Sequence, residues 1–347
     1  MRAALFCGKG VLRVADVAVP EIGEFDILLK TKSALVCGTD IRMFKNGRSD
    51  ISEQFPLILG HELSGVIERV GTAVQRYREG MRVTVAPNMG CGICDICVSG
   101  NTHLCPDYKA LGINLNGGFA EYVRIPQEAV VQGNVTIFPK DMTFEEAAIA
   151  EPLSCAYSAF ERAAIRAGDS VLIFGAGPIG IMHAKLAKMA GAAKVMFTDP
   201  NKNRLDAVKA FDASFIVLDQ RDIATEVMEL THGRGIDVSI TACPSPEAQI
   251  KAVELAALNG RVVLFGGLAA DKACVPLNAN IIHYRQLNVT GTTRSSLAQF
   301  RKTIELIGDG LIDVKSLITG RFKLEHIGKA FEQAACGIGI KNAVNFN

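Results

Sequence analysis

The stretch VLIFGAGPIG at residues 171–180 decides the fold of the second half of this chain. Its four apolar residues suit a short buried strand, and three glycines follow at Gly175, Gly177 and Gly180. Pro178 suits the first turn of a helix. A strand, a glycine-rich turn and a helix in this order predict a dinucleotide site, because helix-end amides attract a pyrophosphate and the glycines allow its close approach.

The predicted cofactor is NAD because of Asp199, nineteen residues after Gly180 at the end of the next apolar segment. A carboxylate at this point can accept both hydroxyls of an adenosine ribose and would repel a 2′-phosphate, so we expect NAD rather than NADP. A glycine motif alone is often only a turn. The surrounding strands and the register of Asp199 favour the binding site.

Around this stretch, short apolar segments alternate with helical segments. The predicted strands are Val171–Phe174, Val195–Thr198, Phe215–Leu218, Asp237–Ile240, Val262–Phe265 and Leu287–Thr290. Six strands with five connections predict an α/β fold with a doubly wound parallel sheet of the Rossmann type.

The first 140 residues consist instead of short alternating segments separated by Gly and Pro, which predict a β-rich domain. Thr143 and Glu146 form a capping box, and the apolar positions after them predict a helix that runs through the low 160s. We expect one domain at residues 1–152, a nucleotide-binding domain at 153–291, and a return of 292–347 to the first domain. This last part is predicted to hold two helices and a strand near Ala343–Phe346.

Composition excludes several classes of function. Lys plus Arg (37) balances Asp plus Glu (36) without a block of like charge, which argues against a protein that binds nucleic acid or acidic membranes. No apolar run suits a signal peptide or a membrane span, so we expect a cytoplasmic protein with small-molecule partners. In that reducing compartment the ten cysteines are expected to serve metal binding or chemistry rather than disulfides.

Four of these cysteines, Cys91, Cys94, Cys97 and Cys105, lie in one fifteen-residue loop within residues 90–106. Four thiolates are the ligand set of a tetrahedral zinc ion, and four protein ligands leave no open position. The predicted zinc is therefore structural and substitutes for a hydrophobic core in this loop. The alternatives, a disulfide cluster or four buried thiols, are disfavoured by compartment and spacing.

A second candidate group is dispersed along the chain and includes Cys37, His61 and Glu151. Taken singly, each is more commonly a buried cysteine, a core histidine or a surface glutamate. Together they offer three zinc ligands and leave a fourth position for substrate or water, which is typical of a catalytic site. Asp40 is a candidate to support these ligands by hydrogen bonding, with a turn aspartate as the alternative.

In these motifs the chain resembles the zinc-containing medium-chain alcohol dehydrogenase family, from Cys37 through Arg294. The segment Gly60-His61-Glu62, the four-cysteine loop, the segment GGFAEY at 117–122 and the glycine motif occur in that family's order. The resemblance implies a GroES-like β-rich catalytic domain beside the Rossmann domain. The segment EPLS at 151–154 resembles the sorbitol and polyol dehydrogenase branch, in which a glutamate replaces a cysteine ligand.

The resemblance also implies roles for single residues. Cys37, His61 and either Glu62 or Glu151 would hold a catalytic zinc. Thr39 would pass the substrate proton to the cofactor ribose. The implied cofactor contacts are Ile179, Asp199 and Arg204 at the adenosine half, Gly266, Gly267 and Leu268 at the nicotinamide half, and Thr292, Thr293 and Arg294 closing the site.

Two positions depart from the family pattern. Arg42 stands where relatives usually carry a histidine that ends a proton relay, and Met43 stands where sorbitol dehydrogenases have a substrate-facing tyrosine. One hypothesis is that Arg42, with Arg294, faces an anionic group such as a sugar phosphate or carboxylate. The alternative is a solvated surface arginine.

The expected function is zinc- and NAD-dependent oxidation of a secondary alcohol of a polyol, sugar alcohol or related sugar derivative to the ketone. One alternative is the oxidation of an amino alcohol by a threonine-3-dehydrogenase-like enzyme, a branch that the run GPIGIM at 177–182 resembles. Another is a non-catalytic NAD- and zinc-binding protein. Family analogy implies a homodimer or homotetramer.

Overall fold

The structure, a computed structural model, describes residues 1–347. The chain forms two compact units: unit 1 comprises Met1–Ser154 and Ser295–Asn347, and unit 2 comprises Cys155–Arg294. The bounds of unit 2 lie a few residues beyond those expected from the sequence. None of the helices is both long and apolar enough to cross a membrane.

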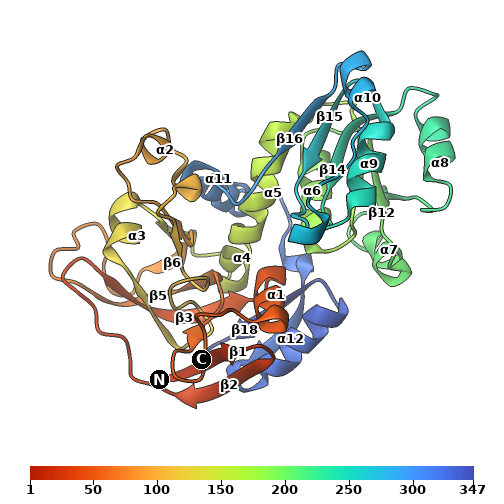
Figure 1. Cartoon of the computed structure of the whole chain (residues 1–347). Coiled ribbons are helices and arrows are strands. Elements are labelled where there is room, and N and C mark those ends of the chain that lie inside the picture. The colour runs from red at the N-terminus through yellow and green to blue at the C-terminus, as the bar shows by residue number, and fades with distance from the viewer. The chain divides into compact units, whose positions relative to one another are not determined.

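Unit 2 contains a six-stranded sheet with the order β13-β12-β11-β14-β15-β16, in which every pair of neighbours is parallel (Figure 1). The order reverses at β11, which comes first along the chain among the strands of this sheet, so the predicted doubly wound sheet is confirmed. The elements are β11 (Ser170–Phe174), α6 (Pro178–Met189), β12 (Lys194–Thr198), α7 (Lys202–Val208), β13 (Ile216–Val217), α8 (Ile223–Leu230), β14 (Ile236–Thr241), α9 (Pro246–Glu254), β15 (Ala256–Leu264), α10 (Ala279–Tyr284) and β16 (Asn288–Gly291).

Strand β11 shows why the sheet is covered on both faces. Val171 and Ile173 pack into one core cluster with apolar residues of α6, whereas Leu172 and Phe174 pack into another with residues of α8 and α9. Successive side chains of a strand point to opposite faces, so an uninterrupted apolar strand requires a helix layer on each face. The four residues before the glycine motif are all buried, as a central parallel strand requires.

Unit 1 is built around a seven-stranded sheet with the order β10-β6-β5-β3-β18-β17, to which β9 is added beside β3. A three-stranded sheet (β2-β1-β4) and a small two-stranded sheet (β7-β8) complete its strands. The elements are β1 (Arg2–Gly8), β2 (Val11–Asp16), β3 (Ile27–Leu35), α1 (Gly38–Asn46), β4 (Leu57–Ile58), β5 (Glu62–Val70), β6 (Arg82–Val85), β7 (Asn88–Met89), α2 (Asp95–Val98), β8 (Lys109–Ala110), β9 (Tyr122–Ile125), α3 (Gln127–Gln132), β10 (Val135–Ile137), α4 (Phe144–Ala148), α11 (Leu297–Gly308), β17 (Ile318–Lys323), α12 (Ile327–Cys336) and β18 (Lys341–Asn345). Helix α5 (Ala150–Ala163) begins in unit 1 and continues into unit 2.

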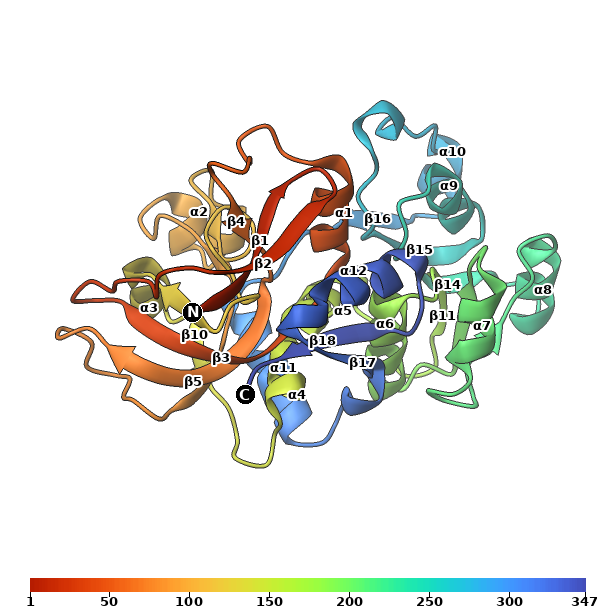
Figure 2. The same ribbon diagram turned by 90° about the horizontal axis from the view of Figure 1, so that it is seen from below.

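Three neighbouring strands of unit 1 come from distant parts of the chain. Strand β3 pairs with β5 on one side, where Leu35 lies opposite Glu62, and with β18 on the other, where Leu35 lies opposite Ala343. Strand β17, which the sequence did not predict, runs parallel to β18 (Figure 2). The last strand begins at Lys341, earlier than expected, so this lysine lies at the edge where β3 ends and β5 begins.

The helix predicted after Thr143 is two helices. The capping box is confirmed, because the Thr143 hydroxyl accepts from the Glu146 backbone amide (3.2 Å) and the Glu146 carboxylate accepts from the Thr143 amide (2.8 Å). Helix α4 nevertheless ends at Ala148, and α5 begins at Ala150. Pro152 has no N–H to donate to the carbonyl of Ala148, so a break one turn earlier places the proline in the first turn of α5.

Candidate active site and its zinc-ligand groups

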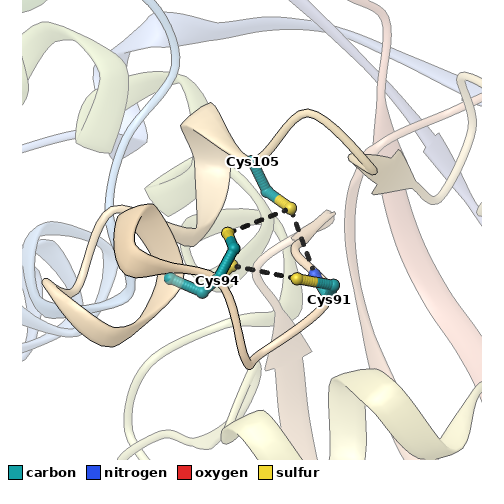
Figure 3. A group of neighbouring side chains, drawn as sticks. Cys91, Cys94 and Cys105 are labelled. Atoms are coloured by element: carbon teal, nitrogen blue, oxygen red, sulfur yellow. Dashed lines mark hydrogen bonds between the residues drawn. The ribbon is translucent and has the colours of Figure 1, made fainter.

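The four cysteines of residues 90–106 converge as their spacing predicted. Their sulfur atoms all lie within 4.8 Å of one another, and Figure 3 shows the side chains of Cys91, Cys94 and Cys105 turned toward a common centre. The Sγ atoms of Cys91 and Cys97 are 4.0 Å apart, and those of Cys94 and Cys105 are 3.9 Å apart. A disulfide requires about 2.05 Å, so these are free thiols in a tetrahedral ligand arrangement. We call residues 90–106 the four-cysteine lobe.

Local backbone geometry prepares this lobe for a cation. Backbone hydrogen bonds from Ile93 and Cys94 lower the pKa of Cys91 to about 7, which favours the thiolate, whereas burial raises the pKa of Cys97 to about 12. Gly90 has no room for a side chain, because a Cβ atom there would lie 2.4 Å from the sulfur of Cys97. The donor atoms fit a closed, structural zinc site.

The lobe has little apolar packing of its own. Ile93 and Val98 are 85% and 75% exposed, and Ile96 and Leu104 are also exposed. Its buried side chains are two cysteines and a histidine: Cys97, Cys105 and His103. A segment with this arrangement depends on its metal ligands rather than on a hydrophobic core.

The second group of donors is assembled at the strand ends of unit 1. Cys37 follows β3 and precedes α1, while His61 and Glu62 stand at the start of β5. The Cys37 sulfur, a ring nitrogen of His61 and a carboxylate oxygen of Glu62 lie within 4.8 Å of one another. We call these three residues the open cluster, because three protein ligands leave one position of a tetrahedral zinc ion free.

Asp40 supports two members of the open cluster. Its Oδ2 accepts a hydrogen bond from the backbone amide of Cys37 (2.9 Å), and its Oδ1 lies 3.5 Å from Nδ1 of His61. Burial lowers the pKa of His61, but Cys37 and Asp40 outweigh it and raise this pKa well above 6.5. A carboxylate facing Nδ1 leaves Nε2 as the nitrogen that can bind a metal.

Glu151, in the first turn of α5, is buried but does not join the group of three. Burial raises the pKa of Glu151 to about 7; His61 opposes this rise and Glu62 adds to it. Of the two carboxylates that the sequence left open as the third ligand, Glu62 is the one that lies with Cys37 and His61. Glu151 is a nearby carboxyl that titrates near neutral pH.

One buried residue at this site was missed by sequence reasoning. Lys341 is 4% exposed, and its ammonium group donates to Glu62 Oε1 at 2.6 Å. Burial lowers the pKa of Lys341, but the charges of Glu62 and Cys37 raise it by more than burial lowers it. The pKa is therefore above 10.5, and the side chain is charged. No motif surrounds Lys341 in the sequence, and only the pairing of β18 with β3 brings it to the open cluster.

Three residues near Cys37 differ in their surroundings. Thr39 and Arg42 lie on α1, where Arg42 is exposed and one of its Nη atoms is 3.5 Å from the Thr39 hydroxyl. Met43 is only 8% exposed and belongs to the hydrophobic core of unit 1. Met43 therefore acts in packing in this structure.

In unit 2 the glycine motif has the geometry of a phosphate-binding turn. Gly175 has a φ of +115°, and Gly177 precedes α6, whose first residue is Pro178. A Cβ atom on Gly180 would lie 1.9 Å from the carbonyl oxygen of Gly175, so this position must be glycine. At Gly177 a Cβ atom would meet only Arg204, at 3.9 Å, which leaves the helix N-terminus accessible to a ligand.

Asp199 follows β12 and is held by two backbone amides: Ala176 donates to Oδ2 and Asn201 donates to Oδ1, each at 2.8 Å. It lines a cavity of about 500 Å³ together with Gly175, Arg204 and Cys243. This volume is in the range of small-molecule sites. The cavity lies at the carboxyl edge of the sheet, where doubly wound folds bind nucleotides.

The other predicted cofactor residues lie beyond the ends of β15 and β16. Gly266 donates to the carbonyl of Thr241 (2.7 Å), and a Cβ atom there would lie 2.3 Å from the carbonyl oxygen of Cys243. Gly267 is exposed and Leu268 is half-buried. The hydroxyl oxygens of Thr292 and Ser158 are 3.1 Å apart, and Thr293 and Arg294 are exposed. Ile179 lies elsewhere, on α6, and is half-buried.

Comparison with known proteins gives full-length matches. The family model of the alcohol dehydrogenase GroES-like domain matches residues 23–135, and that of the zinc-binding dehydrogenases matches residues 178–309. Sorbitol dehydrogenase of Bacillus subtilis is 31% identical over 96% of this chain and 93% of its own length. L-Threonine 3-dehydrogenase of Bacillus licheniformis is 33% identical over 92% of each chain. The crystal structure of galactitol-1-phosphate dehydrogenase from Escherichia coli is 26% identical with a TM-score of 0.88, covering all of both chains.

Proposed function

Because this chain belongs to the zinc-containing medium-chain alcohol dehydrogenase family and is thus an oxidoreductase, we propose that it oxidises a secondary alcohol of a polyol or related sugar derivative to the ketone, with NAD as acceptor. The observation that carries this proposal is the open cluster. Cys37, His61 and Glu62 offer three donor atoms within 4.8 Å of one another, so a tetrahedral ion held by them would keep one position for a further ligand, whereas the four-cysteine lobe offers four.

A zinc ion held by the open cluster would act as a Lewis acid that lowers the pKa of the substrate hydroxyl. Asp40 orients His61 and the backbone of Cys37, so these ligands are preorganised. Glu151, with a pKa near 7, is available for hydrogen bonding beside the ligands rather than as a ligand itself. In the overall reaction the alcohol loses its hydroxyl proton, its carbon-bound hydrogen leaves as hydride to the nicotinamide, and a ketone and NADH result.

Thr39 is proposed to take the substrate proton, as the family resemblance implies. Where relatives continue a relay with histidine, Arg42 lies beside Thr39, and a guanidinium has no acceptor atom. We therefore propose that the proton passes from Thr39 through the cofactor ribose to solvent without a histidine. The exposed Arg42 is also the residue we propose to face an anionic group on the substrate.

The cofactor proposal rests on unit 2. The glycine motif would hold the pyrophosphate at the start of α6, and Asp199 would accept the adenosine ribose hydroxyls. Replacing Asp199 by Ala should raise the KM for NAD by roughly tenfold to a hundredfold, the worth of a hydrogen bond to a charged group, while the KM for NADP stays constant or falls. Equal use of NAD and NADP by the unaltered enzyme would contradict the proposed preference.

The substrate class is tested by one panel of polyols, polyol phosphates, aldonates and threonine, with NADH formation as the readout. We expect the highest kcat/KM for a polyol or its phosphate, and Arg42→Ala should raise KM for the phosphorylated and carboxylate substrates but not for neutral polyols. A preference for threonine would favour the amino-alcohol alternative, to which the similarity to L-threonine 3-dehydrogenase also points. No turnover of any compound, with zinc and NAD both bound, would indicate a non-catalytic binding protein.

A further inference from the structure

Thr198, the last residue of β12, has a buried hydroxyl group without a hydrogen-bond partner. The residue is 2% exposed, whereas its backbone carbonyl is paired and accepts from the amide of Gly175 at 2.8 Å. A buried hydroxyl costs free energy when no hydrogen bond replaces those that it made to water. A ligand that supplied the missing hydrogen bond would recover this cost on binding.

Thr198 lines the cavity of about 500 Å³ that also contains Asp199. Of the residues that line this cavity, Thr198 is the one with a buried side-chain polar atom that lacks a hydrogen-bond partner. Asp199 accepts from two backbone amides. The Ser245 hydroxyl accepts from the Ala248 amide at 3.1 Å and donates to Glu247 Oε2 at 2.8 Å. The unpaired hydroxyl of Thr198 therefore indicates a contact with whatever fills the cavity.

Apolar residues line the cavity on the face of the sheet to which Thr198 points. Phe174, Ile223 and Ala248 line it and belong to the core cluster that β11, α8 and α9 form on that face. Thr198 shares the face, because side chains two apart in a strand point the same way and Met196 belongs to this cluster. An apolar wall with one hydrogen-bonding group suits a flat heteroaromatic ring, whose face packs against the wall and whose edge takes the hydrogen bond.

We propose that Thr198 is a specificity-determining residue for the cofactor, and that its hydroxyl hydrogen-bonds to the purine base while Asp199 accepts the ribose hydroxyls. This inference rests on the proposed function, in which the cavity receives the adenosine half of NAD. A threonine hydroxyl can donate to a ring nitrogen or accept from an amino group, so a purine supplies the partner that the free protein lacks. A base of the same shape without polar atoms leaves the hydroxyl unpaired and binds more weakly.

The test measures binding rather than turnover. AMP carries the adenosine half of the cofactor alone, and its Kd is obtained from competition with NADH, whose fluorescence reports binding. The second probe is the 4-methylindole analogue of AMP, which keeps the shape of adenine but has no base atom free to hydrogen-bond. We expect Thr198→Val to raise the Kd for AMP about fivefold, the worth of one hydrogen bond, and to leave the Kd for the analogue unchanged. Thr198→Ser, which keeps the hydroxyl, should bind AMP like the unaltered enzyme.

Ser239→Ala is the matched control. Ser239 lies in β14 of the same sheet, is fully buried and has a hydroxyl without a partner, but it does not line the cavity. Its replacement should leave the Kd for AMP unchanged. Without ligand, Thr198→Val should unfold at the same or a higher temperature than the unaltered enzyme, because valine has no hydroxyl to leave unpaired. Thr198→Ala also lacks the hydroxyl and supplies the same comparison of probes if the valine variant does not fold.

Three results would overturn the inference: an unchanged Kd for AMP in Thr198→Val, an equal loss of affinity for AMP and its 4-methylindole analogue, or the same loss in Ser239→Ala. An equal loss for both probes would mean that Thr198 affects the ribose or the shape of the cavity instead of the base. A different result concerns the proposed function. If neither NADH nor AMP binds the unaltered enzyme, the cavity is not a cofactor site, and the proposed function fails together with this inference.

Discussion

The four-cysteine lobe and the open cluster are both groups of zinc ligands in unit 1, but they are built in opposite ways. In the lobe, four sulfur atoms from residues 91–105 converge within 4.8 Å in a segment whose apolar side chains are largely exposed. In the open cluster, the ligands come from the ends of β3 and β5, and the carboxylate is held by a lysine 279 residues further along the chain. We expect the lobe to depend on a bound metal for its fold, whereas strand pairing in unit 1 brings the open cluster together.

The four-cysteine lobe is therefore expected to contribute stability, and the open cluster is expected to contribute chemistry. A closed set of four ligands stabilises a loop but offers no position to a substrate. A set of three on a rigid sheet adds little to stability and leaves such a position.

The largest expected effect is the loss of turnover in Cys37→Ser. Lewis-acid stabilisation of developing charge is worth several kcal/mol, so kcat should fall by roughly a thousandfold or more. The Tm should change by only a few degrees, because β3 and β5 remain paired. Steady-state kinetics, metal analysis and thermal unfolding provide the measurements, with exposed Cys336→Ser as the control. Loss of folding in Cys37→Ser would show that the open cluster is structural too.

Cys97→Ser should have the next largest effect, on stability. Cys97 is buried at the centre of the four-cysteine lobe, and losing a structural metal belongs to the few changes that cost roughly 4 kcal/mol or more. Denaturant unfolding and zinc content measure this, and proteolysis should cut first within residues 90–106. Cys274→Ser, at an exposed cysteine outside the lobe, is the matched control. If Cys97→Ser lost its zinc and the lobe stayed folded, the four-cysteine lobe would not depend on metal for its stability.

Glu151→Gln should change the pH dependence of stability when the open cluster has no metal, as in a Cys37→Ser background. Burial holds the pKa of Glu151 at about 7, above its ordinary value of 4.5, so the folded state binds a proton that the unfolded state releases between these pH values. The stability that protonated Glu151 contributes at low pH is therefore lost as the pH rises from about 4.5 to about 7.

The amide of glutamine carries no charge, so Glu151→Gln should be more stable than its parent by about 3 kcal/mol at pH 8 and equally stable near pH 4. Urea unfolding at several pH values measures the difference. A gap that stays constant across this range would mean that Glu151 is not the titrating group.

The smallest expected effect is that of Ile93→Ser. This side chain is 85% exposed on the four-cysteine lobe, so its replacement should alter the free energy of unfolding by about 0.5 kcal/mol or less. Leu63→Ala, at a side chain 1% exposed in the core of unit 1, should cost roughly 2–5 kcal/mol. A large loss in Ile93→Ser would indicate that the exposed apolar side chains stabilise the lobe after all.

Sequence patterns predicted the fold well where the signal was local. The run VLIF before the glycines is a central buried strand, and each of the six predicted strands of unit 2 is present. The single helix expected after Thr143 was wrong in one respect, since the helix breaks at Ile149 between α4 and α5, which places Pro152 in the first turn of α5. Strand β17 was not anticipated, because half of its residues are exposed and its pairing with β18 supplies the stability that its own side chains do not.

The sequence by itself determined the four-cysteine lobe, because all its ligands lie within one loop and short spacing limits how far the sulfur atoms can separate. It also predicted the phosphate-binding turn, because the glycines follow an apolar strand, precede a helix and stand in register with Asp199. Only the tertiary structure placed a carboxylate oxygen of Glu62 with the donor atoms of Cys37 and His61 and brought Lys341 to Glu62. The physical reason is that strand pairing across the order β5-β3-β18 joins residues hundreds of positions apart, and no local pattern encodes which strands become neighbours.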